Sequence, residues 1–527
     1  MIEANSNLRS VTSYRNTAAT TPRVETQLIP EPDLLFGYGG LNPNPKFGLA
    51  EYGPYDLTAH DGGVRDLGVG LIGTGQTVED CKAWLQRCEF PIESAEGKAR
   101  QYPRFPGFSD KSPFHCRLKL HTNPEQQLTT HEVGQITSER DDEIRFEKAL
   151  DLIDRKISLL LEVANPQVIV CAIPDEIADS CWSLGGERLR KRRKGLSRSE
   201  RVLLRIIERD RELGQGHLFP EAFELEEDAK PIFRDFRRAL KARVMKWRCP
   251  IQIGLPGTWR DSKRVQDPAT RAWNFLVALY YKAGGTPWGL AELDDGTCFV
   301  GVSFYQVATE KLNYVYSSVA QVFDKQGRGI VVRGKKFEWD PSDWGRSPHL
   351  PKLAAENLLR EALDKYREFS LTNPKRVVVH KSSRYWPDEI EGFKQAASGL
   401  SQYDFVALYQ RGTRFFREGA YPPLRGTLCQ IGTWASYLYT SGYTPNLGTY
   451  PGPYVPEPIE IVEHFGDSSV QKISREILAL TKLNWNSATF SCGFPMTLFF
   501  AREVGKILSE FPDGEDQVIQ PSYRFYI

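Results

Sequence analysis

The sequence predicts an α/β fold that contains a parallel sheet, and two stretches carry this prediction. Residues 141–163 place apolar side chains at helical spacing, and residues 167–173 form a continuous apolar run rich in β-branched residues. Upstream, an apolar run at residues 69–72 precedes a helical pattern at residues 78–88, with Thr77 as the expected N-cap. Strands that alternate with helices in this way are typical of parallel sheets covered by helices.

The composition is that of a globular protein with several domains. The chain has 527 residues, of which 40% are hydrophobic and 26% are charged, and this length corresponds to about two to four domains. Its formal net charge is only +1. A nucleic-acid-binding function would therefore require positive charge that is concentrated locally.

The cysteines and the N-terminus predict a cytoplasmic protein. The nine Cys residues are scattered, with no C-x-x-C spacing, which favours reduced thiols and gives no zinc site. The N-terminus lacks the basic and apolar regions of a signal peptide. No apolar run reaches the length of about 18 residues that a membrane span needs, so no membrane association is expected.

The chain before residue 256 is expected to complete a first α/β domain. Residues 1–32 are polar and are expected to form a loose arm, whereas residues 33–56, interrupted by Gly and Pro, are expected to form short strands and turns. A helix is expected at residues 231–247, followed by a strand at residues 250–254.

The pattern after residue 256 predicts a second domain. A helix around Trp273 leads into strand-like runs, and two helices close the chain. We place the domain boundary before Pro256, which gives domains of residues 33–255 and 256–527. The expected strands lie within residues 298–322 and at 330–332 and 377–380, and the last helices at 470–483 and 497–508.

Two conspicuous motifs have ordinary explanations beside functional ones. Gly68, Gly70 and Gly73 match the Gly-x-Gly-x-x-Gly pattern of dinucleotide-binding folds, but they lie within the expected strand instead of opening a helix. We therefore favour strand packing there and expect no organic cofactor. Residues 188–194 form a dense basic run, which is either a solvated loop or a loop that follows nucleic-acid phosphates.

A second set of basic residues is better placed to bind one anion. Arg237 and Lys241 are four residues apart and share a helix face. Gln252 lies on the strand that follows, and Lys282 on the next helix. Elements in this order can converge on one anionic group, although each residue taken alone is more typical of a surface charge.

The segment from residue 272 to 305 resembles the start of the PIWI domain of Argonaute proteins. Asn274 and Lys282 precede Gly284 and Gly285 with the spacing found in that family. The basic set is similar to the Argonaute MID pocket for a guide 5′-phosphate, with Arg237 where Tyr or His is usual and Ala278 where a second Lys often stands. The resemblance implies a guide 5′-phosphate site formed by Arg237, Lys241, Gln252, Asn274 and Lys282.

The resemblance also implies a PIWI domain that has lost its nuclease. Ser303 stands where an active Argonaute has its first metal-binding Asp, and Lys381 and Arg502 are expected at two further ligand positions. These side chains cannot bind two metal ions in place of carboxylates. We therefore expect no catalytic residues and no enzymatic activity in this chain.

The same cations would suit a groove that holds a nucleic-acid backbone without cutting it. Arg502 is one candidate for such a contact. Lys482, Asn484 and Asn486 are further candidates, with a frayed helix end as the alternative explanation.

Leu34 to Gly37, Gly48 and the sequence from Tyr52 to Pro54 resemble the beginning of short prokaryotic Argonautes. This resemblance implies a Rossmann-like MID domain followed by a ribonuclease H-like PIWI domain. It also implies a protein that uses a guide, expected to be RNA, to bind complementary single-stranded DNA in defence against plasmids or phages. The implied partner is a chain with an APAZ region and a TIR, sirtuin-type or nuclease effector. The alternatives are an active guide-dependent endonuclease and a guide-free structural subunit of a defence complex.

The C-terminal residues 523–527 are aromatic and apolar, which predicts a buried chain end. In some related Argonautes the terminal carboxylate reaches the guide phosphate through a divalent cation. The resemblance thus implies Mg²⁺ at the 5′-phosphate, with the carboxylate of Ile527 as a ligand.

Overall fold

The structure is a computed structural model of the chain. It describes residues 23–60, 63–94, 100–184, 234–261, 265–306, 314–323, 329–334, 337–338, 348–410, 412–432, 435–452, 455–511 and 519–527. The basic run at residues 188–194 and most of the expected N-terminal arm lie outside these ranges.

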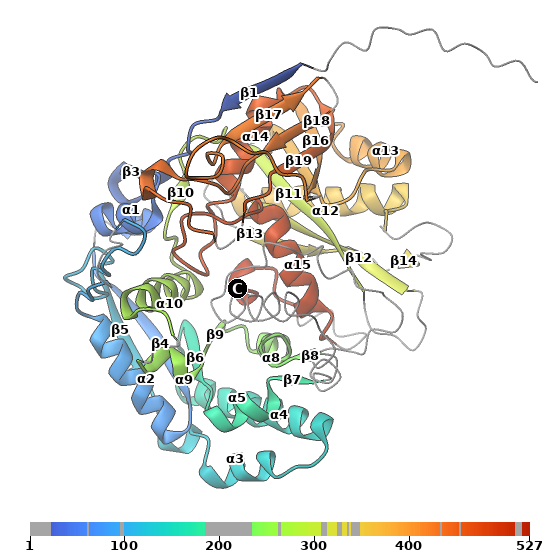
Figure 1. Cartoon of the computed structure of the whole chain (residues 1–527). Helices are drawn as coiled ribbons and strands as arrows, with labels where there is room; N and C mark the ends of the chain where they lie inside the picture. The colour runs from blue at the N-terminus through green and yellow to red at the C-terminus, as the bar shows by residue number, and fades with distance from the viewer. Residues whose placement is uncertain are drawn as a thin grey trace, which may run out of the picture.

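The N-terminal half is built around a four-stranded parallel sheet, as the sequence predicts (Figure 1). Its strands stand in the order β5-β4-β6-β9, and each neighbouring pair is parallel. The chain adds β5 on one side of β4, and then adds β6 and β9 on the other side. Because the direction of the connections reverses at β4, helices cover both faces of the sheet. The strands are β4 (Arg65–Gly73), β5 (Cys116–His121), β6 (Val168–Ala172) and β9 (Ile251–Gly254).

Helix α2 (Gly75–Cys88) packs on one face of this sheet and α4 (Asp142–Val163) on the other. Thr74, and not Thr77, is the N-cap of α2, because the two threonines form a capping box in which Thr77 is the third helical residue. Shorter helices complete this layer: α3 (Thr130–Thr137), α5 (Asp175–Cys181), α8 (Phe236–Val244) and α9 (Pro256–Trp259).

Residues 33–56 differ from the expectation of strands and turns alone. Strands β2 (Leu34–Leu35) and β3 (Leu41–Asn42) are present, and β2 pairs with both β3 and β10 (Gly289–Leu290) in a small sheet. The segment Pro45–Tyr52 is a helix, α1. Asn44 caps this helix through its side chain, and Pro45 is its first residue, a position in which Pro is favoured.

The C-terminal half contains a ten-stranded sheet. At its centre β11 (Thr297–Gln306) pairs in parallel with β15 (Arg376–Lys381), which pairs in parallel with β16 (Gln402–Tyr409). On the far side of β11 the antiparallel strands β12 (Tyr314–Phe323) and β13 (Gly329–Arg333) follow, with β14 (Phe337–Glu338) paired to β12. Beyond β16 the order is β19 (Ile459–Gly466), β18 (Ala435–Leu438), β17 (Thr427–Ile431) and β1 (Val24–Leu28).

Helices cover both faces of the large sheet. Helices α12 (Lys352–Ser370) and α13 (Pro387–Ala396) pack on one face, while α14 (Val470–Leu480) and α15 (Met496–Leu508) pack on the other. Gly301 of β11 allows α15 to approach closely, since a Cβ atom there would lie 1.7 Å from the carbonyl oxygen of Thr497. None of the helices in the described part of the chain has the length and apolar character to cross a membrane.

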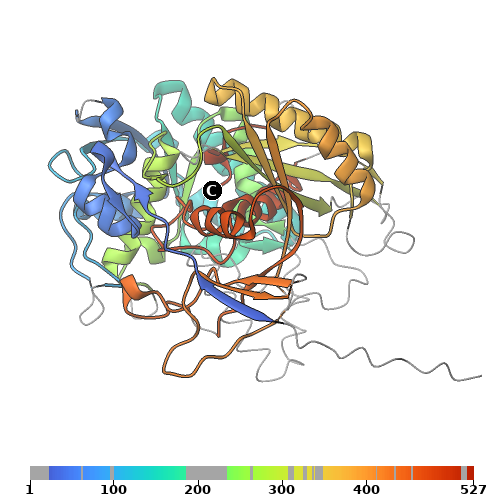
Figure 2. The same cartoon turned by 90° about the horizontal axis from the view of Figure 1, so that it is seen from above.

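Helix α10 (Pro268–Lys282) joins the two halves (Figures 1 and 2). Nearly all of its side chains are buried, and its apolar residues belong to one hydrophobic cluster that contains Val69 of β4 and Val378 of β15. The two sheets therefore share a continuous core through this helix.

A buried charge network fixes the start of β15. The Arg376 guanidinium donates to Asp404 at 2.7 Å and forms two bonds to Glu476 at 2.5 and 3.0 Å. Although burial acts to raise the pKa of Asp404, hydrogen bonds from His464 and Ser468 and the charge of Arg376 hold it at about 2. The network ties β15, β16, β19 and α14 together.

We expect Arg376→Met to lower the free energy of unfolding by about 3–5 kcal/mol, because it leaves two buried carboxylates without their cation. The control is Arg360→Ala, which removes an exposed ion pair to Glu356 on α12 and should cost less than about 1 kcal/mol. Urea unfolding midpoints measure both changes. Equal effects of the two substitutions would contradict a stabilising role for the network.

Candidate nucleic-acid interface

Three elements from both halves of the chain bring the predicted basic residues together. Helix α8 buries Phe236, Leu240 and Val244, so its other face carries Arg237 and Lys241. Asp235 caps this helix by accepting from the backbone N–H of Arg238. Strand β9 supplies Gln252, and Lys282 is the last residue of α10.

We call Arg237, Lys241, Gln252 and Lys282 the basic cluster. The two lysines of this cluster donate hydrogen bonds to neutral oxygens. Lys282 Nζ donates to Gln252 Oε1 at 2.5 Å, and Lys241 Nζ donates to the carbonyl oxygen of Tyr526 at 3.0 Å. The Arg237 guanidinium lies over the ring of Trp182 at 5.8 Å. Within the described ranges, none of the three cations forms an ion pair with a carboxylate.

The electrostatics of the cluster favour an added anion. Burial lowers the pKa of Lys282, which is 2% exposed, well below its usual value, and the charges of Lys241 and Arg237 lower it further. Burial and then Arg237 lower the pKa of Lys241 to about 7. An anion bound among these cations would reduce their mutual repulsion and favour their charged forms. Glu503 lies near enough to act on Lys241, but it is bonded to Lys506 at 2.6 Å.

The C-terminal tail forms one wall of the cluster. Ile527 is buried, as predicted, and residues Tyr523–Phe525 form a short 3₁₀ helix. Sequence patterns did not identify two contributions of this tail. The Tyr526 carbonyl binds Lys241, and Arg524 reaches the end of α10, where its Nη1 would lie 3.4 Å from a Cβ atom at Gly284.

The donor set around the tail does not make a magnesium site by itself. No group of three or more His, Cys, Asp or Glu residues able to hold a metal occurs among the described residues. Gln252 Oε1 and the Tyr526 carbonyl, two oxygens that Mg²⁺ prefers, are both engaged by lysines. A divalent cation near Ile527 would therefore depend on ligands supplied by a bound phosphate.

Asn274 lies apart from the cluster. It precedes Lys282 by eight residues on α10, which places it about 12 Å away along the helix axis. Its Oδ1 accepts from the backbone N–H of Ala488 at 3.2 Å. The structure thus gives Asn274 a role in holding the loop after α14, and does not bring it to the basic cluster.

Two of the three positions expected to have lost metal ligands, Ser303 and Lys381, do not face one another. Parallel pairing aligns Val302 of β11 with Lys381 of β15, so Ser303 and Lys381 point to opposite faces of the sheet. The residue that continues the register opposite Ser303 is Ser382, which lies directly after β15. The structure therefore places Ser382, and not Lys381, beside Ser303. Arg502 lies on α15, and its side chain is outside the described part of the structure.

Lys381 is a buried structural residue. Its Nζ donates to both carboxylate oxygens of Glu389 at 2.6 Å and contacts His349 Nδ1 at 3.1 Å. Burial lowers the pKa of Lys381 to about 8 against the opposing effect of Glu389. We therefore do not assign it to a groove for a nucleic-acid backbone.

Lys482 is likewise enclosed, although we expected it to be free to contact a backbone. Its Nζ binds Glu31 Oε1 at 2.7 Å and the Pro32 carbonyl at 2.9 Å, and it lies 4.5 Å from the Phe490 ring centre. Asn484 is buried and forms a local turn by accepting from the backbone N–H of Asn486 at 3.1 Å. Only Asn486 of this set is partly exposed. The segment is a packed turn and not a frayed helix end.

The glycine motif lies where the sequence places it. Gly68, Gly70 and Gly73 are all within β4, and Leu160 of α4 and Ala172 of β6 crowd the last two. These glycines therefore allow neighbouring elements to pack closely against β4, because a Cβ atom at Gly70 or Gly73 would lie only 2.5 Å from a neighbouring side chain.

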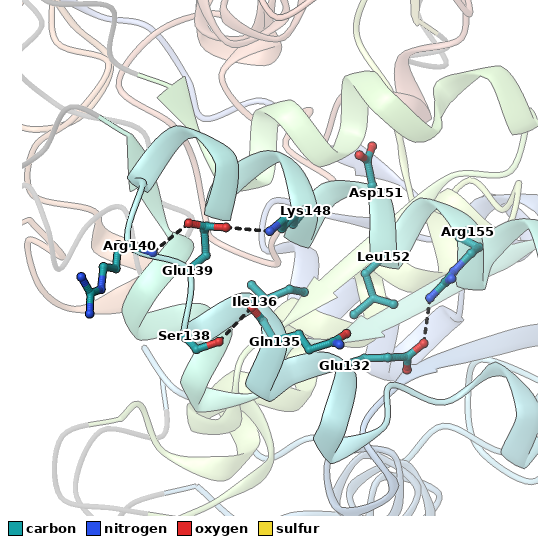
Figure 3. Close-up of a pocket in the computed structure, with 10 residues that line it drawn as sticks. All are labelled: Glu132, Gln135, Ile136, Ser138, Glu139, Arg140, Lys148, Asp151, Leu152 and Arg155. Carbon is teal, nitrogen blue, oxygen red and sulfur yellow. Dashed lines mark hydrogen bonds and ion pairs between the residues drawn. The ribbon is translucent and has the colours of Figure 1, made fainter.

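A surface pocket between α3 and α4 contains none of the predicted residues (Figure 3). It has a volume of about 730 Å³. Lys148 pairs with Glu139, and Arg155 pairs with Glu132. The pocket is lined by three acidic and three basic side chains, so its formal charge is balanced.

The sequence is similar to two curated Argonautes, while no family model matches the chain. The Protein argonaute of Aquifex aeolicus is 19% identical over 272 residues, which is 51% of this chain and 35% of that protein. The Protein argonaute of Cereibacter sphaeroides is 21% identical over 330 residues, 55% of this chain and 39% of that protein. The matched regions thus span less than half the length of either relative.

Solved structures show the same fold. Clostridium butyricum Argonaute bound to a guide DNA and a 19-mer target DNA superposes with a TM-score of 0.55 at 14% identity, covering 95% of this chain and 55% of that one. The Aa-Ago structure with externally bound siRNA gives a TM-score of 0.51 at 13% identity, with 95% and 56% coverage. The chain is therefore similar in sequence to two Argonaute proteins and has an Argonaute-like α/β fold.

Proposed function

We propose that this chain holds the 5′-phosphate of a guide strand in the basic cluster and presents the guide for pairing with single-stranded DNA. The observation that carries this proposal is the convergence of Arg237, Lys241 and Lys282 without a bonded carboxylate. A phosphate would supply the missing negative charge and accept several charge-assisted hydrogen bonds. RNA is the guide chemistry in this proposal, and base pairing would provide the sequence recognition.

The sheet topologies support a MID-like domain at residues 33–255 and a PIWI domain at residues 256–527. The parallel order β5-β4-β6-β9 is that of a doubly wound, Rossmann-like layer. In the second half, the run β13-β12-β11-β15-β16 combines three antiparallel strands with two strands parallel to β11. This arrangement is the one we expect of a ribonuclease H-like domain.

The second part of the proposal is that the chain does not cut nucleic acid. Two-metal cleavage needs several carboxylates around the scissile phosphate. Ser303, within β11, and Ser382, directly after β15, lie at neighbouring register positions and offer hydroxyl groups where such ligands would stand. An active guide-dependent endonuclease is the alternative, and the assay below distinguishes the two.

In the third part, the chain signals target binding to a partner in the cytoplasm. The partner would carry an APAZ region and a TIR, sirtuin-type or nuclease effector, and the pair would act against plasmids or phages. Support for this part comes from the family resemblance and from the absence of carboxylates at Ser303 and Ser382. The competing function, a guide-free structural subunit, predicts that the purified chain carries no nucleic acid.

The first test compares guides with a 5′-phosphate and with a 5′-hydroxyl. Each lost charge-assisted bond costs about 1.5–3 kcal/mol, so the double variant Lys241→Met, Lys282→Met should bind a 5′-phosphorylated guide at least about a hundredfold more weakly. Fluorescence anisotropy with labelled oligonucleotides measures this. The control is Lys246→Met, because Lys246 is exposed and pairs with Asp154 away from the cluster. Equal affinity of the unmodified protein for both guides would rule out the pocket.

The same assay has an expected pH dependence. The pKa of Lys241 is about 7 in the free protein, and a bound phosphate favours the ammonium form. Preference for the 5′-phosphate should therefore fall as pH rises from about 7 to 9, a range in which the phosphate stays dianionic. A preference that stays constant over this range would show that Lys241 does not contact the phosphate.

A further test concerns the C-terminal carboxylate and Mg²⁺. If the Ile527 carboxylate takes part through a divalent cation, adding four Gly or Ser residues after Ile527 should weaken guide binding and abolish its Mg²⁺ dependence. Chelation by EDTA should then affect the original chain and not the extended one. Unchanged affinity after the extension would remove Ile527 and Mg²⁺ from the site.

The cleavage test uses the chain loaded with guide, complementary DNA, and Mg²⁺ or Mn²⁺. We expect the DNA to remain intact, and Ser303→Asp alone should not restore cutting, because Ser382 still offers no carboxylate. Denaturing gels reveal any product. One defined cut opposite the guide would overturn the proposal. With the effector partner present, target DNA should switch on the partner's activity.

A further inference from the structure

The ten-stranded sheet has two edges that differ in how they end. At the β13 edge the C-terminal tail closes the sheet, since the backbone N–H of Val331 donates to the Pro521 carbonyl and Ile330 forms a bridge with Ser522. At the other edge β1 pairs with β17 on one side only (Figures 1 and 2). No strand in the described ranges pairs with the outer side of β1.

The hydrogen-bond register identifies which β1 backbone groups point outward. Ile29 N–H donates to the Gly426 carbonyl, and Gly432 N–H donates to the Arg23 carbonyl. In an antiparallel pair these bonds recur at every second residue, so Arg23, Glu25, Gln27 and Ile29 face β17. The N–H and C=O groups of Val24, Thr26 and Leu28 therefore face outward.

The side chains at these positions are also unusually apolar for an open edge. Val24 is 58% exposed and Leu28 is 54% exposed. They share a face of β1 with Thr26, beside Ile431 and Cys429 of β17. Natural sheet edges are normally protected by charged side chains, Pro or a bulge. The one charged residue of β1, Glu25, lies on the opposite face from Val24 and Leu28, and β1 has no Pro and pairs with β17 without a register shift.

We propose that β1 is a docking edge for an extended segment of a partner protein, which adds a strand to the sheet. The segment would carry apolar side chains at alternate positions, so that they lie beside Val24 and Leu28. The proposal deepens the partner role described under Proposed function and rests on it. Pairing two five-residue strands alone buries far less than the roughly 1,200 Å² of a stable interface. A second copy held only through this edge is therefore too weakly bound, whereas a partner chain that adds a strand here would contact further surface of this chain as well.

Thr26→Pro tests this proposal selectively. Proline removes the outward N–H of Thr26 but no bond to β17, and an edge strand tolerates it where the N–H faces away from the sheet. Thr26→Ala keeps the N–H and is the matched control. Thr26→Pro should weaken binding of the proposed effector partner roughly tenfold or more, whereas Thr26→Ala should not. Both variants should keep the preference for a 5′-phosphorylated guide.

Amide hydrogen exchange supplies the second readout on the full-length chain. On partner binding, Val24, Thr26 and Leu28 should become protected, while Glu25 and Gln27 are protected before and after. The proposal is overturned if these three amides stay unprotected in the complex, or if Thr26→Pro binds the partner as well as the original chain does. Protection that rises with the chain's own concentration, without a partner, would overturn it in favour of self-association.

A synthetic peptide separates this proposal from the proposed function. If no effector partner binds the chain, a labelled heptapeptide of alternating Val and Thr probes the edge directly. Binding that Thr26→Pro weakens and Thr26→Ala preserves supports the docking edge even though the effector role has failed. Because so short a pairing is weak, the titration extends to millimolar peptide, and no binding at that concentration overturns the docking edge as well.

Discussion

The burial of α10 is the constraint on which the rest of the structure depends. Its apolar residues pack at once against the parallel sheet and the large sheet, so the two halves share one core. This packing takes the last residue of the helix, Lys282, into the interior as well. A lysine buried at that position loses its hydration shell, and its hydrogen-bond partner Gln252 is neutral and does not balance the charge of the ammonium group. An anion bound at the cluster would balance the positive charge that this packing brings into the interior.

Three buried lysines differ in whether a carboxylate balances their charge. Lys381 has Glu389, and Lys482 has Glu31, so each forms a complete ion pair inside the protein. Lys282 has no carboxylate of its own and lies among further cations, Lys241 and Arg237. Removing one partner of a buried ion pair destabilises the fold, because the other charge is left buried without compensation. Of these three lysines, only Lys282 lies among further cations and forms no ion pair with a carboxylate in the described part of the chain, so an anion bound there would balance its charge.

Periodicity predicted the elements well, and it could not predict where individual side chains point. The pattern of residues 141–163 corresponds to α4, and the apolar run at residues 167–173 contains β6. The converging set Arg237, Lys241, Gln252 and Lys282 also follows from the order of its elements. Lys381 and Ser382 show the limit, because a shift of one residue moves a side chain to the opposite face of a strand. The contact of Tyr526 with Lys241 could not be predicted, since it uses a backbone carbonyl, a group that every residue carries.

The basic cluster belongs to neither half of the chain alone. Arg237, Lys241 and Gln252 precede residue 256, whereas Lys282 and the Tyr526 carbonyl follow it. The tail that contacts Lys241 is also the segment that closes the β13 edge of the large sheet. Forming the cluster therefore requires the parallel sheet, α10 and the large sheet to be assembled together. A guide held here would contact both domains at once, so its binding free energy would also stabilise their docking, since a ligand stabilises the state that binds it.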